Sequence, residues 1–380
     1  MPADFPDASS VPTYADRLAR LAELAGVSGA DAVLITPGPD LAYFIGHSIG
    51  SHERLTCLVV PAAGRPSLLV PTLERPGWAG SPVEDMDVAI GTWTDGEDPY
   101  AALAGLLPED ARVLSVDYHM PAVHALNAQA IVPGSELTLA GETIAQLRMR
   151  KSGEEVTSLA EAGASIDRVQ GRIGEWLRSG RTENEVAADI AAAIVAEGHA
   201  RPDFVIVGSG PNGASPHHEA SDRVIEPGDV VVIDIGGPMP SGYFSDCTRT
   251  YVVGGAPVTD RVRAVYEVVR RAQAAGVAAV RPGVVAESID AASRSVIERA
   301  GFGEYFITRT GHGIGLEVHE HPYMVAGNTT TLEEGMAFSV EPGIYLPGEF
   351  GVRIEDIVVV GESGAVLMNN APTELTVVGV

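Results

Sequence analysis

Residues 228–237 read GDVVVIDIGG, an apolar run that follows a glycine and carries the acid Asp234 near its end. Residues 335–343 read GMAFSVEPG and place Glu341 equivalently, six residues after a glycine and directly before a turn. Short apolar runs bounded by Gly and Pro are typical of buried strands. Each run therefore predicts a strand that carries a carboxylate into an apolar interior.

A second acid follows each run in a further extended segment. Asp246 lies twelve residues after Asp234, and Glu355 lies fourteen residues after Glu341. Helical patterns precede both runs, so the order of two helices followed by strands occurs twice. This repeat predicts an internal pseudo-two-fold duplication, in which two facing halves each give two carboxylates to one pocket.

These carboxylates predict a metal centre. A carboxylate buried without a partner is costly, so it is normally paired, protonated or bound to metal. His312, between two glycines in RTGHGIG, adds one accessible imidazole. Hard oxygen ligands and a single imidazole suit two divalent cations. We expect Asp246 and Glu355 to bridge these ions.

Asp234 would complete the shell of one ion, and His312 and Glu341 that of the other. Metal binding lowers the pKa of water from 15.7 toward about 7, so a bridging hydroxide is the expected nucleophile. The alternative is ordinary ion pairing, but only Arg249 and Arg353 lie nearby in the sequence to neutralise four acids.

The chain is predicted to contain two domains. Residues 1–140 alternate extended and helical patterns, which predicts an α/β domain, and no chemical motif occurs in it. Residues 141–152 form a linker that leads into a helix, and residues 153–380 form the larger domain with the acids. The expected elements of the first domain are a helix ending at Gly26, strands within 31–40, 56–62, 67–71, 87–93 and 111–117, and helices near 98–106 and 120–129.

Helices of the larger domain have recognisable starts. The capping boxes Ser152–Glu155 and Thr182–Glu185 predict helices that run to about residues 178 and 198. Two further helices are expected at about 258–276 and 284–300.

The composition excludes several classes of partner. The net charge is −26, with acids spread along the chain, which argues against nucleic acid or an anionic membrane. No apolar run approaches the roughly 20 residues of a membrane span, and no signal-peptide pattern opens the sequence. Cys57 and Cys247 make no disulfide framework and fit a cytoplasmic protein. On a strand Cys247 would point away from Asp246, so we expect a small buried residue rather than a ligand.

Three other histidines are candidates for substrate contact. His319 lies seven residues after His312 and is predicted to hydrogen-bond the substrate or the tetrahedral intermediate. The alternative is a surface histidine in the cluster of His319, Glu320 and His321. His217 and His218 follow a Gly- and Asn-rich turn, and one is expected to contact substrate while the other is exposed.

Seven segments resemble those of the pita-bread metallopeptidases, in the proline-specific branch of Xaa-Pro dipeptidase (prolidase) and aminopeptidase P. They are LRMRKSGEEV, VIVGSGPNGASPHHEASD, GDVVVIDIGG, GYFSDCTRTYVVG, RTGHGIGLEVHEHP, GMAFSVEPGIY and GVRIEDIVVV. The resemblance implies an α+β fold, with a C-terminal pita-bread (creatinase/aminopeptidase) domain preceded by a smaller α/β creatinase-type N-terminal domain.

The resemblance also implies roles for individual residues. The implied metal ligands are Asp234, Asp246, His312, Glu341 and Glu355. His217 and His319 would contact substrate and assist catalysis, Glu341 would also shuttle a proton, and Arg353 would belong to the substrate site. Such enzymes bind two divalent ions per subunit, with manganese first and cobalt, iron or zinc as alternatives, and they are commonly homodimers. Their substrate is a small peptide with proline at its second position.

Three positions depart from the family pattern. The spacing of the two aspartates is one residue longer than usual, Thr308 stands where many members have a histidine, and Tyr323 stands where some prolidases have an arginine for the dipeptide carboxylate. Prolidase activity therefore leads, and aminopeptidase P activity on longer peptides is the alternative. Two further alternatives are a relative acting on another C–N bond without metal and an inactive binding protein. The large N-terminal domain argues against methionine aminopeptidase.

Overall fold

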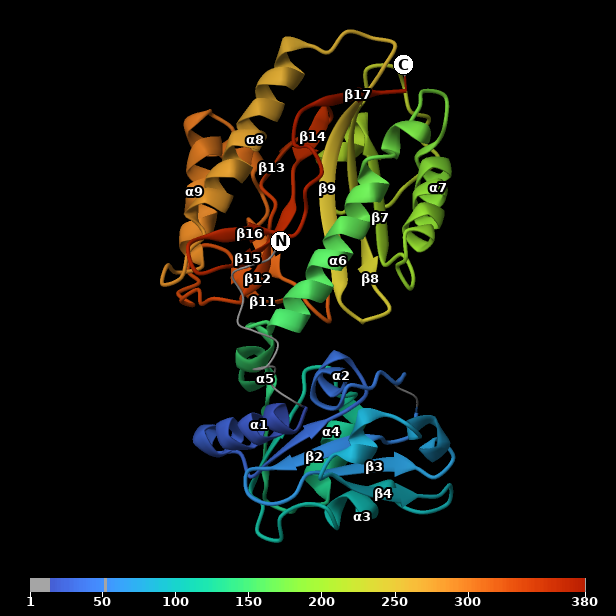
Figure 1. Cartoon of the computed structure of the whole chain (residues 1–380), viewed down its shortest axis with the longest axis vertical. Helices are drawn as coiled ribbons and strands as arrows, with labels where there is room; N and C mark the ends of the chain where they lie inside the picture. Colours follow the sequence, from blue (N-terminus) through green and yellow to red (C-terminus); the bar gives the residue numbers. More distant parts are fainter. Residues whose placement is uncertain (1–13, 51–52, 380) are drawn as a thin grey trace. The chain divides into compact units, whose positions relative to one another are not determined.

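The structure is a computed structural model and describes residues 14–50 and 53–379. Its described residues divide into two compact units, an N-terminal one up to Arg148 and a C-terminal one from Met149, which are described separately (Figure 1). Within the described residues, no helix is both long and apolar enough to span a bilayer.

The N-terminal unit contains a six-stranded mixed sheet in the order β4-β3-β2-β1-β5-β6. Its strands are β1 Ala32–Ile35, β2 Cys57–Pro61, β3 Ser67–Pro71, β4 Ala89–Trp93, β5 Val113–Val116 and β6 Glu136–Leu139. Its α-helices are α1 Tyr14–Ser28, α2 Pro39–Ile45, α3 Pro99–Ala104, α4 Ala122–Ala130 and α5 Gly141–Arg148. The five predicted strands and three predicted helices are confirmed, although α1 continues two residues past Gly26. The short elements α2, α5 and β6 were not predicted.

The C-terminal unit contains two sheets, and two of the four acids lie on or directly beside the strands of each. One has the order β17-β9-β8-β7, and the other has the order β11-β10-β12-β15-β16. The strands of the first are β7 Phe204–Ser209, β8 Val230–Pro238, β9 Phe244–Val253 and β17 Thr376–Val378. Those of the second are β10 Gly311–Gly313, β11 Glu320–Met324, β12 Ala337–Val340, β15 Asp356–Val360 and β16 Ala365–Leu367. The hairpin of β13 Gly343–Leu346 and β14 Phe350–Arg353 pairs separately.

Two pairs of helices pack against these strands. Helices α6, Gly153–Gln170, and α7, Glu183–Ala196, share an apolar core with β7, β8 and β9. Helices α8, Asp260–Ala279, and α9, Glu287–Arg299, lie side by side and pack against the strands of the second half. Figure 1 shows α6 and α7 on one side of the unit and α8 and α9 on the other. The helices and strands therefore recur in the order that the duplication predicted.

Helix boundaries follow local signals where those signals exist. Both predicted capping boxes are present, at the starts of α6 and α7. The prediction that the first helix runs to residue 178 is wrong, because α6 ends at Gln170 and a 3₁₀ turn, Ile173–Glu175, follows. The 3₁₀ turn keeps Ile173 and Leu177 in the core, so the apolar spacing continues after the α-helix has ended.

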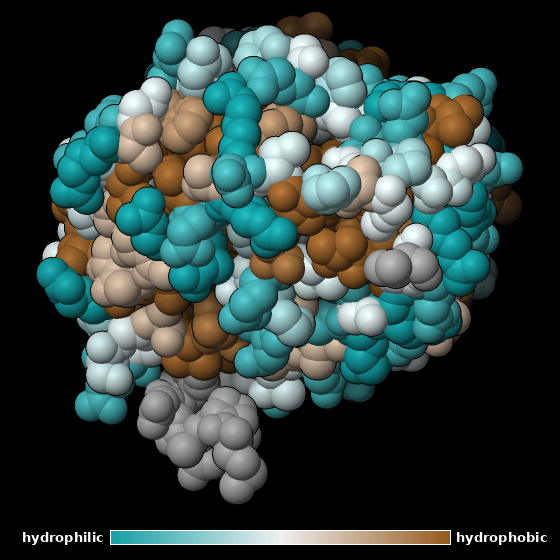
Figure 2. Space-filling view, turned by 90° about the horizontal axis from the view of Figure 1, so that it is seen from above, coloured by the Kyte–Doolittle hydropathy of each residue, from teal (hydrophilic) through white to brown (hydrophobic). Residues whose placement is uncertain are grey.

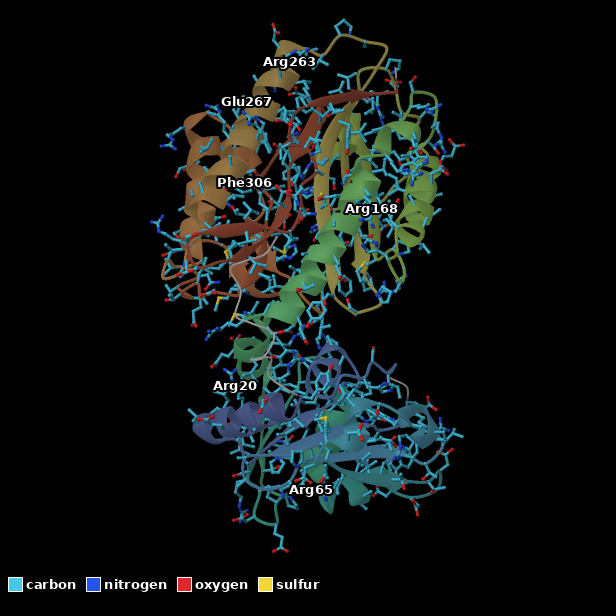
Figure 3. All side chains as sticks on the ribbon, viewed as in Figure 1. Arg20, Arg65, Arg168, Arg263, Glu267 and Phe306 are labelled. Atoms are coloured by element: carbon cyan, nitrogen blue, oxygen red, sulfur yellow. The ribbon has the colours of Figure 1, made fainter. Side chains whose placement is uncertain are left out.

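Charged side chains cover the outer face of α8, where Arg263 and Glu267 are exposed (Figure 3). The opposite face buries Val262, Val265 and Val269 at helical spacing. Figure 2 shows hydrophilic and hydrophobic residues interspersed over one face of the molecule.

Candidate active site

The five predicted metal ligands line one cavity of about 490 Å³ in the C-terminal unit, a size typical of small-molecule sites. Strands of both halves contribute. Asp234 lies on β8, Asp246 on β9 and His312 on β10, while Glu341 directly follows β12 and Glu355 directly precedes β15.

Strand register brings the two aspartates together. On the antiparallel pair β8–β9, Asp234 lies opposite Thr248, and Asp246 lies opposite Gly236, two positions away. Residues two apart on a strand share a face of the sheet, so both carboxylates enter the cavity. Cys247 points to the other face and belongs to the core under α6 and α7. The expectation of a small buried residue at Cys247 is confirmed.

Like charges crowd at the centre of the cavity. Single ligand atoms of Asp246, His312 and Glu355 lie within 4.8 Å of one another. Burial and the facing carboxylates raise the pKa of Asp246 and of Glu355 well above their usual values. Two buried carboxylate oxygens, Asp234 Oδ1 and Glu355 Oε1, have no hydrogen-bond partner among the described residues. Buried acceptors without donors are costly, so this arrangement favours a bound cation.

The imidazole of His312 points to the same conclusion. Its Nδ1 lies 3.1 Å from the Gly313 carbonyl oxygen, which can only accept, so Nδ1 carries the proton. Its Nε2 faces Glu341 Oε1 at 3.0 Å and Asp246 Oδ2 at 3.6 Å. In the tautomer with its proton on Nδ1 alone, Nε2 has a lone pair that faces two carboxylates, and a metal ion between these atoms would satisfy all three. The donor set thus fits divalent cations.

Three polar side chains hold the carboxylates in place, and a fourth supports one of them. The sequence analysis did not single out three of these residues, and it gave Arg353 another role. Thr248 Oγ1 donates to Glu355 Oε2 at 2.7 Å, and Ser339 Oγ donates to Glu341 Oε1 at 2.8 Å. Arg353 Nη2 donates to Asp234 Oδ2 at 2.6 Å, and its Nη1 donates to Tyr345 Oη at 2.9 Å. Hydroxyl residues on a strand occur in many proteins, so sequence gave no signal for Thr248, Ser339 or Tyr345.

The predicted substrate-contact residues lie around the same cavity. His217 and His319 both line it, together with Arg353, and the His319 ring meets His312 edge to face with 4.1 Å between centroids. Burial, followed by the charges of His312 and Arg309, lowers the pKa of His319 to about 4. Glu320, next to His319, is buried and pairs with Lys151. His319 is exposed, as the alternative expected, although its ring packs against His312 and lines the cavity, whereas Glu320 of the same cluster is buried.

His217 is exposed and lines the cavity, but the expectation that its neighbour His218 is merely exposed is wrong. His218 Nε2 lies 2.7 Å from Glu183 Oε2 and is only 16% exposed. Glu183 is fully buried at the first position of α7. Its carboxylate accepts further hydrogen bonds from Ser209, Asn212 and Ser221. Glu183 therefore anchors both ends of the segment that presents His217 to the cavity.

We predict that Glu183→Gln destabilises the protein by about 2–3 kcal/mol at pH 7, because an amide nitrogen cannot accept these hydrogen bonds. It should also raise KM more than it lowers kcat, since His217 would be less well positioned. Burial opposes ionisation, but the Ser209, Ser221 and His218 hydrogen bonds lower the Glu183 pKa to about 2. A lowered folded-state pKa gives stability that is present above the unfolded value and is lost as the pH falls.

The stability gap between wild type and Glu183→Gln, measured by urea unfolding, should therefore narrow from about pH 4.5 toward pH 2. Glu185→Gln is the matched control, since Glu185 caps the same helix terminus but is 58% exposed. The control should cost at most about 1 kcal/mol. Equal losses in the two variants would contradict the anchoring role of Glu183.

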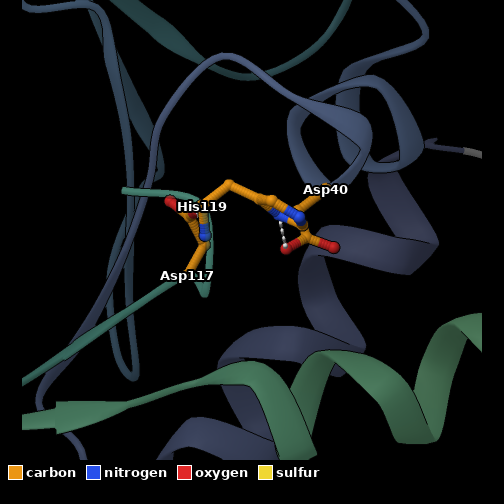
Figure 4. Close-up of side chains that lie close together, drawn as sticks. All are labelled: Asp40, Asp117 and His119. Atoms are coloured by element: carbon orange, nitrogen blue, oxygen red, sulfur yellow. Dashed lines mark hydrogen bonds and ion pairs between the residues drawn. The ribbon is translucent and has the colours of Figure 1, made fainter. Parts of the chain in front are cut away.

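The N-terminal unit also contains a group of potential ligands, Asp40, Asp117 and His119 (Figure 4). Its acids already have partners. Asp40 Oδ1 pairs with Arg148 at 2.6 Å, and Asp117 accepts from both the backbone and the hydroxyl of Thr36. Because the guanidinium already supplies the positive charge, we assign no metal to this group.

Comparison with known proteins follows the same division of the chain. Residues 17–150 match the creatinase/prolidase N-terminal domain, and residues 157–362 match metallopeptidase family M24. The chain belongs to metallopeptidase family M24. The family implies divalent metal ions as cofactors, and the predicted resemblance and fold class are confirmed.

This M24 protein is similar to curated dipeptidases and to solved structures. It is 51% identical to a probable dipeptidase PepE of Mycobacterium bovis, over 97% of each chain. It is 36% identical to an Xaa-Pro dipeptidase of Lactobacillus helveticus, over 92% of this chain and 96% of the relative. The crystal structure of dipeptidase PepE from Mycobacterium ulcerans superimposes with a TM-score of 0.92 at 52% identity, covering 97% of this chain and 98% of that one.

Proposed function

We propose that this M24 metallopeptidase is an Xaa-Pro dipeptidase that uses two divalent ions, held by Asp234, Asp246, His312, Glu341 and Glu355. The observation that carries the proposal is the convergence of five ligand side chains from two half-domains around unpartnered carboxylate oxygens. The names of the relatives support the dipeptide substrate. Asp246 and Glu355, the second acid of each half, are proposed as the bridging ligands.

The ions, when bound, would acidify a shared water and so supply the nucleophile. The protein's own groups bind and orient the peptide. His319, open to the cavity beside His312, would donate a hydrogen bond to the carbonyl oxygen of the scissile bond as charge develops there. Glu341 would hold the proton that the proline nitrogen must receive, while Ser339 fixes its carboxylate. His217 would contact the N-terminal residue of the substrate.

The proline requirement has a physical basis. A bond into proline is a tertiary amide without an N–H, so a peptidase that grips this N–H loses a contact. A nucleophile that attacks the carbonyl needs no such contact. The apolar side chains of Phe204, Ile206 and Val318 line the same cavity and would accept the pyrrolidine ring.

The test is hydrolysis of Ala-Pro by protein that has been stripped with a chelator and reloaded with manganese, cobalt or zinc. Stripped protein should lose activity, and one of the metals should restore it. At saturation the active protein should contain two ions per chain, measured by elemental analysis. Activity that survives complete stripping would rule out the metal-dependent reaction, and one ion at full activity would rule out the dinuclear one.

Substrate length is tested with Ala-Pro-Ala under the same conditions. A dipeptidase should cleave Ala-Pro at least about tenfold faster at limiting substrate. Faster cleavage of the tripeptide would favour aminopeptidase P activity instead.

A further inference from the structure

Two arginines line the active-site cavity, and they differ in what they already bind. Arg353 is 3% exposed and directs its donors to Asp234, Thr248 and Tyr345. It is therefore occupied in holding a candidate metal ligand. Arg309 is half-buried, and no acceptor among the described residues receives a hydrogen bond or forms an ion pair with its guanidinium.

Arg309 is nevertheless held in one orientation. Its guanidinium lies 4.6 Å from the centroid of the Tyr323 ring, a stacking contact that favours Arg and leaves its N–H edge open. Strand pairing enforces the contact. Thr310 N donates to Met324 O at 3.0 Å, and His312 lies opposite Tyr323 in the β10–β11 register. The charge is thus preorganised at the wall of the cavity.

A second polar group beside it also has no partner. The buried hydroxyl oxygen of Thr308 forms no hydrogen bond among the described residues, and Thr308 lines the same cavity. Arg294 holds this segment from behind, through the carbonyl oxygens of Phe306 and Thr308. Open guanidinium donors and an unsatisfied hydroxyl on adjacent residues together form a site for a small oxyanion.

We propose that Arg309, stacked on Tyr323 and assisted by the Thr308 hydroxyl, binds the C-terminal carboxylate of the substrate and makes the protein a dipeptidase. This inference rests on the proposed function and adds the group that selects substrate length. In a dipeptide the carboxylate follows the scissile bond by a single residue, about 3.8 Å of chain. The scissile bond and the C-terminal carboxylate of a dipeptide therefore fit one cavity. A longer peptide presents a neutral amide at that place and continues into the arginine.

The cavity needs such a cation if it is to accept a dipeptide. Asp234, Asp246, Glu341 and Glu355 all line it, and the chain carries a net charge of −26. The two ions of the proposed function would offset the four carboxylates of the cavity, but the acidic protein around them still repels an approaching carboxylate. Arg353 compensates only Asp234 directly, which leaves Arg309 as the charge available to the substrate within the described part of the cavity.

The experiment compares Ala-Pro with Ala-Pro amide, which lacks the carboxylate charge, in wild type, Arg309→Met and Arg309→Lys. Methionine keeps the length and can still pack on Tyr323. Wild type should prefer Ala-Pro over the amide by about 10- to 100-fold in kcat/KM. Arg309→Met should lose most of this preference, because kcat/KM should fall for Ala-Pro and stay unchanged for the amide. Arg309→Lys should keep part of the preference. Arg281→Met, an exposed arginine outside the cavity, is the control and should behave like wild type.

An equal loss for both substrates in Arg309→Met, or an unchanged preference for the carboxylate, would overturn the proposal. Calorimetric binding of a non-cleavable Ala-Pro analogue with a reduced peptide bond, and of its amide, gives an independent readout. Wild type should bind the acid more tightly than the amide, and Arg309→Met should bind both alike. If wild type cleaves neither peptide, the proposed function fails, yet this binding difference still decides whether Arg309 recognises the carboxylate.

Discussion

Replacing Asp246 with asparagine is expected to abolish hydrolysis of Ala-Pro and, in metal-free protein, to increase stability. Asp246 is 4% exposed and faces the carboxylates of Glu355, Asp234 and Glu341. Asparagine keeps the shape and cannot ionise, so it removes the cost of burying an acid among other acids. The free energy of unfolding in the presence of chelator should rise by about 1–4 kcal/mol. Activity with saturating manganese should fall by about 1,000-fold or more, because the proposed bridge between the ions would be lost.

Urea unfolding with chelator and with manganese separates the two effects. A ligand that binds only the folded state stabilises it in proportion to its affinity. Wild type should therefore gain stability on addition of manganese, and Asp246→Asn should gain much less. The variant should thus be the more stable protein in chelator and the less stable one in manganese. This reversal is expected only for a residue that binds the metal. Retention of activity within tenfold of wild type would contradict the assignment of Asp246.

Asp356→Asn is the control for the expected gain in stability of the metal-free protein. Asp356 is buried next to Glu355, but it pairs with Arg249 at 2.6 Å and accepts from Gln273. Removing a partnered charge leaves the arginine uncompensated. Asp356→Asn should thus destabilise the metal-free protein, whereas Asp246→Asn stabilises it. Stabilisation by both changes would show only that the unit carries too much negative charge.

The residues that line the cavity as candidate ligands could be located from the sequence, because the acids interrupt apolar strands. Asp234 and Glu341 follow runs that can only be buried, and the repeated order of the two halves indicated that their acids face each other. Capping boxes likewise predicted the starts of α6 and α7, since both partners of each box lie within four residues. Signals of this kind are local, and a single sequence contains them.

The groups that support the site depend on contacts between distant segments. Glu183 has the pattern of an ordinary helix-start acid, and its burial appears only when the segment from Ser209 to Ser221 closes over it. Arg309 and Tyr323 meet because β10 and β11 pair with His312 opposite Tyr323. A shift of that register by one residue would turn Tyr323 to the other face. Without homologous sequences or coordinates, nothing distinguishes these residues from solvated ones.

Arg353→Met is expected to have the opposite effect to Asp246→Asn on the metal-free protein. Arg353 supplies a positive charge at 2.6 Å from Asp234, in a region where the other carboxylates repel one another. Its loss leaves Asp234 buried and uncompensated, at a cost of about 3–5 kcal/mol in chelator. Manganese should reduce this cost, since the ions replace the missing charge. Turnover should also fall, because Asp234 loses the group that orients its carboxylate.

A second substitution tests whether Arg353 acts through this charge. Asp234→Asn in the Arg353→Met background removes the uncompensated acid, so it should restore most of the lost stability in chelator without restoring activity. Arg261→Met is the matched control, because Arg261 also pairs with a carboxylate at 2.7 Å but is 53% exposed. An exposed pair contributes at most about 1 kcal/mol. If Asp234→Asn gives no rescue, the guanidinium stabilises the site through its contacts with Thr248 and Tyr345 rather than by balancing the carboxylate cluster.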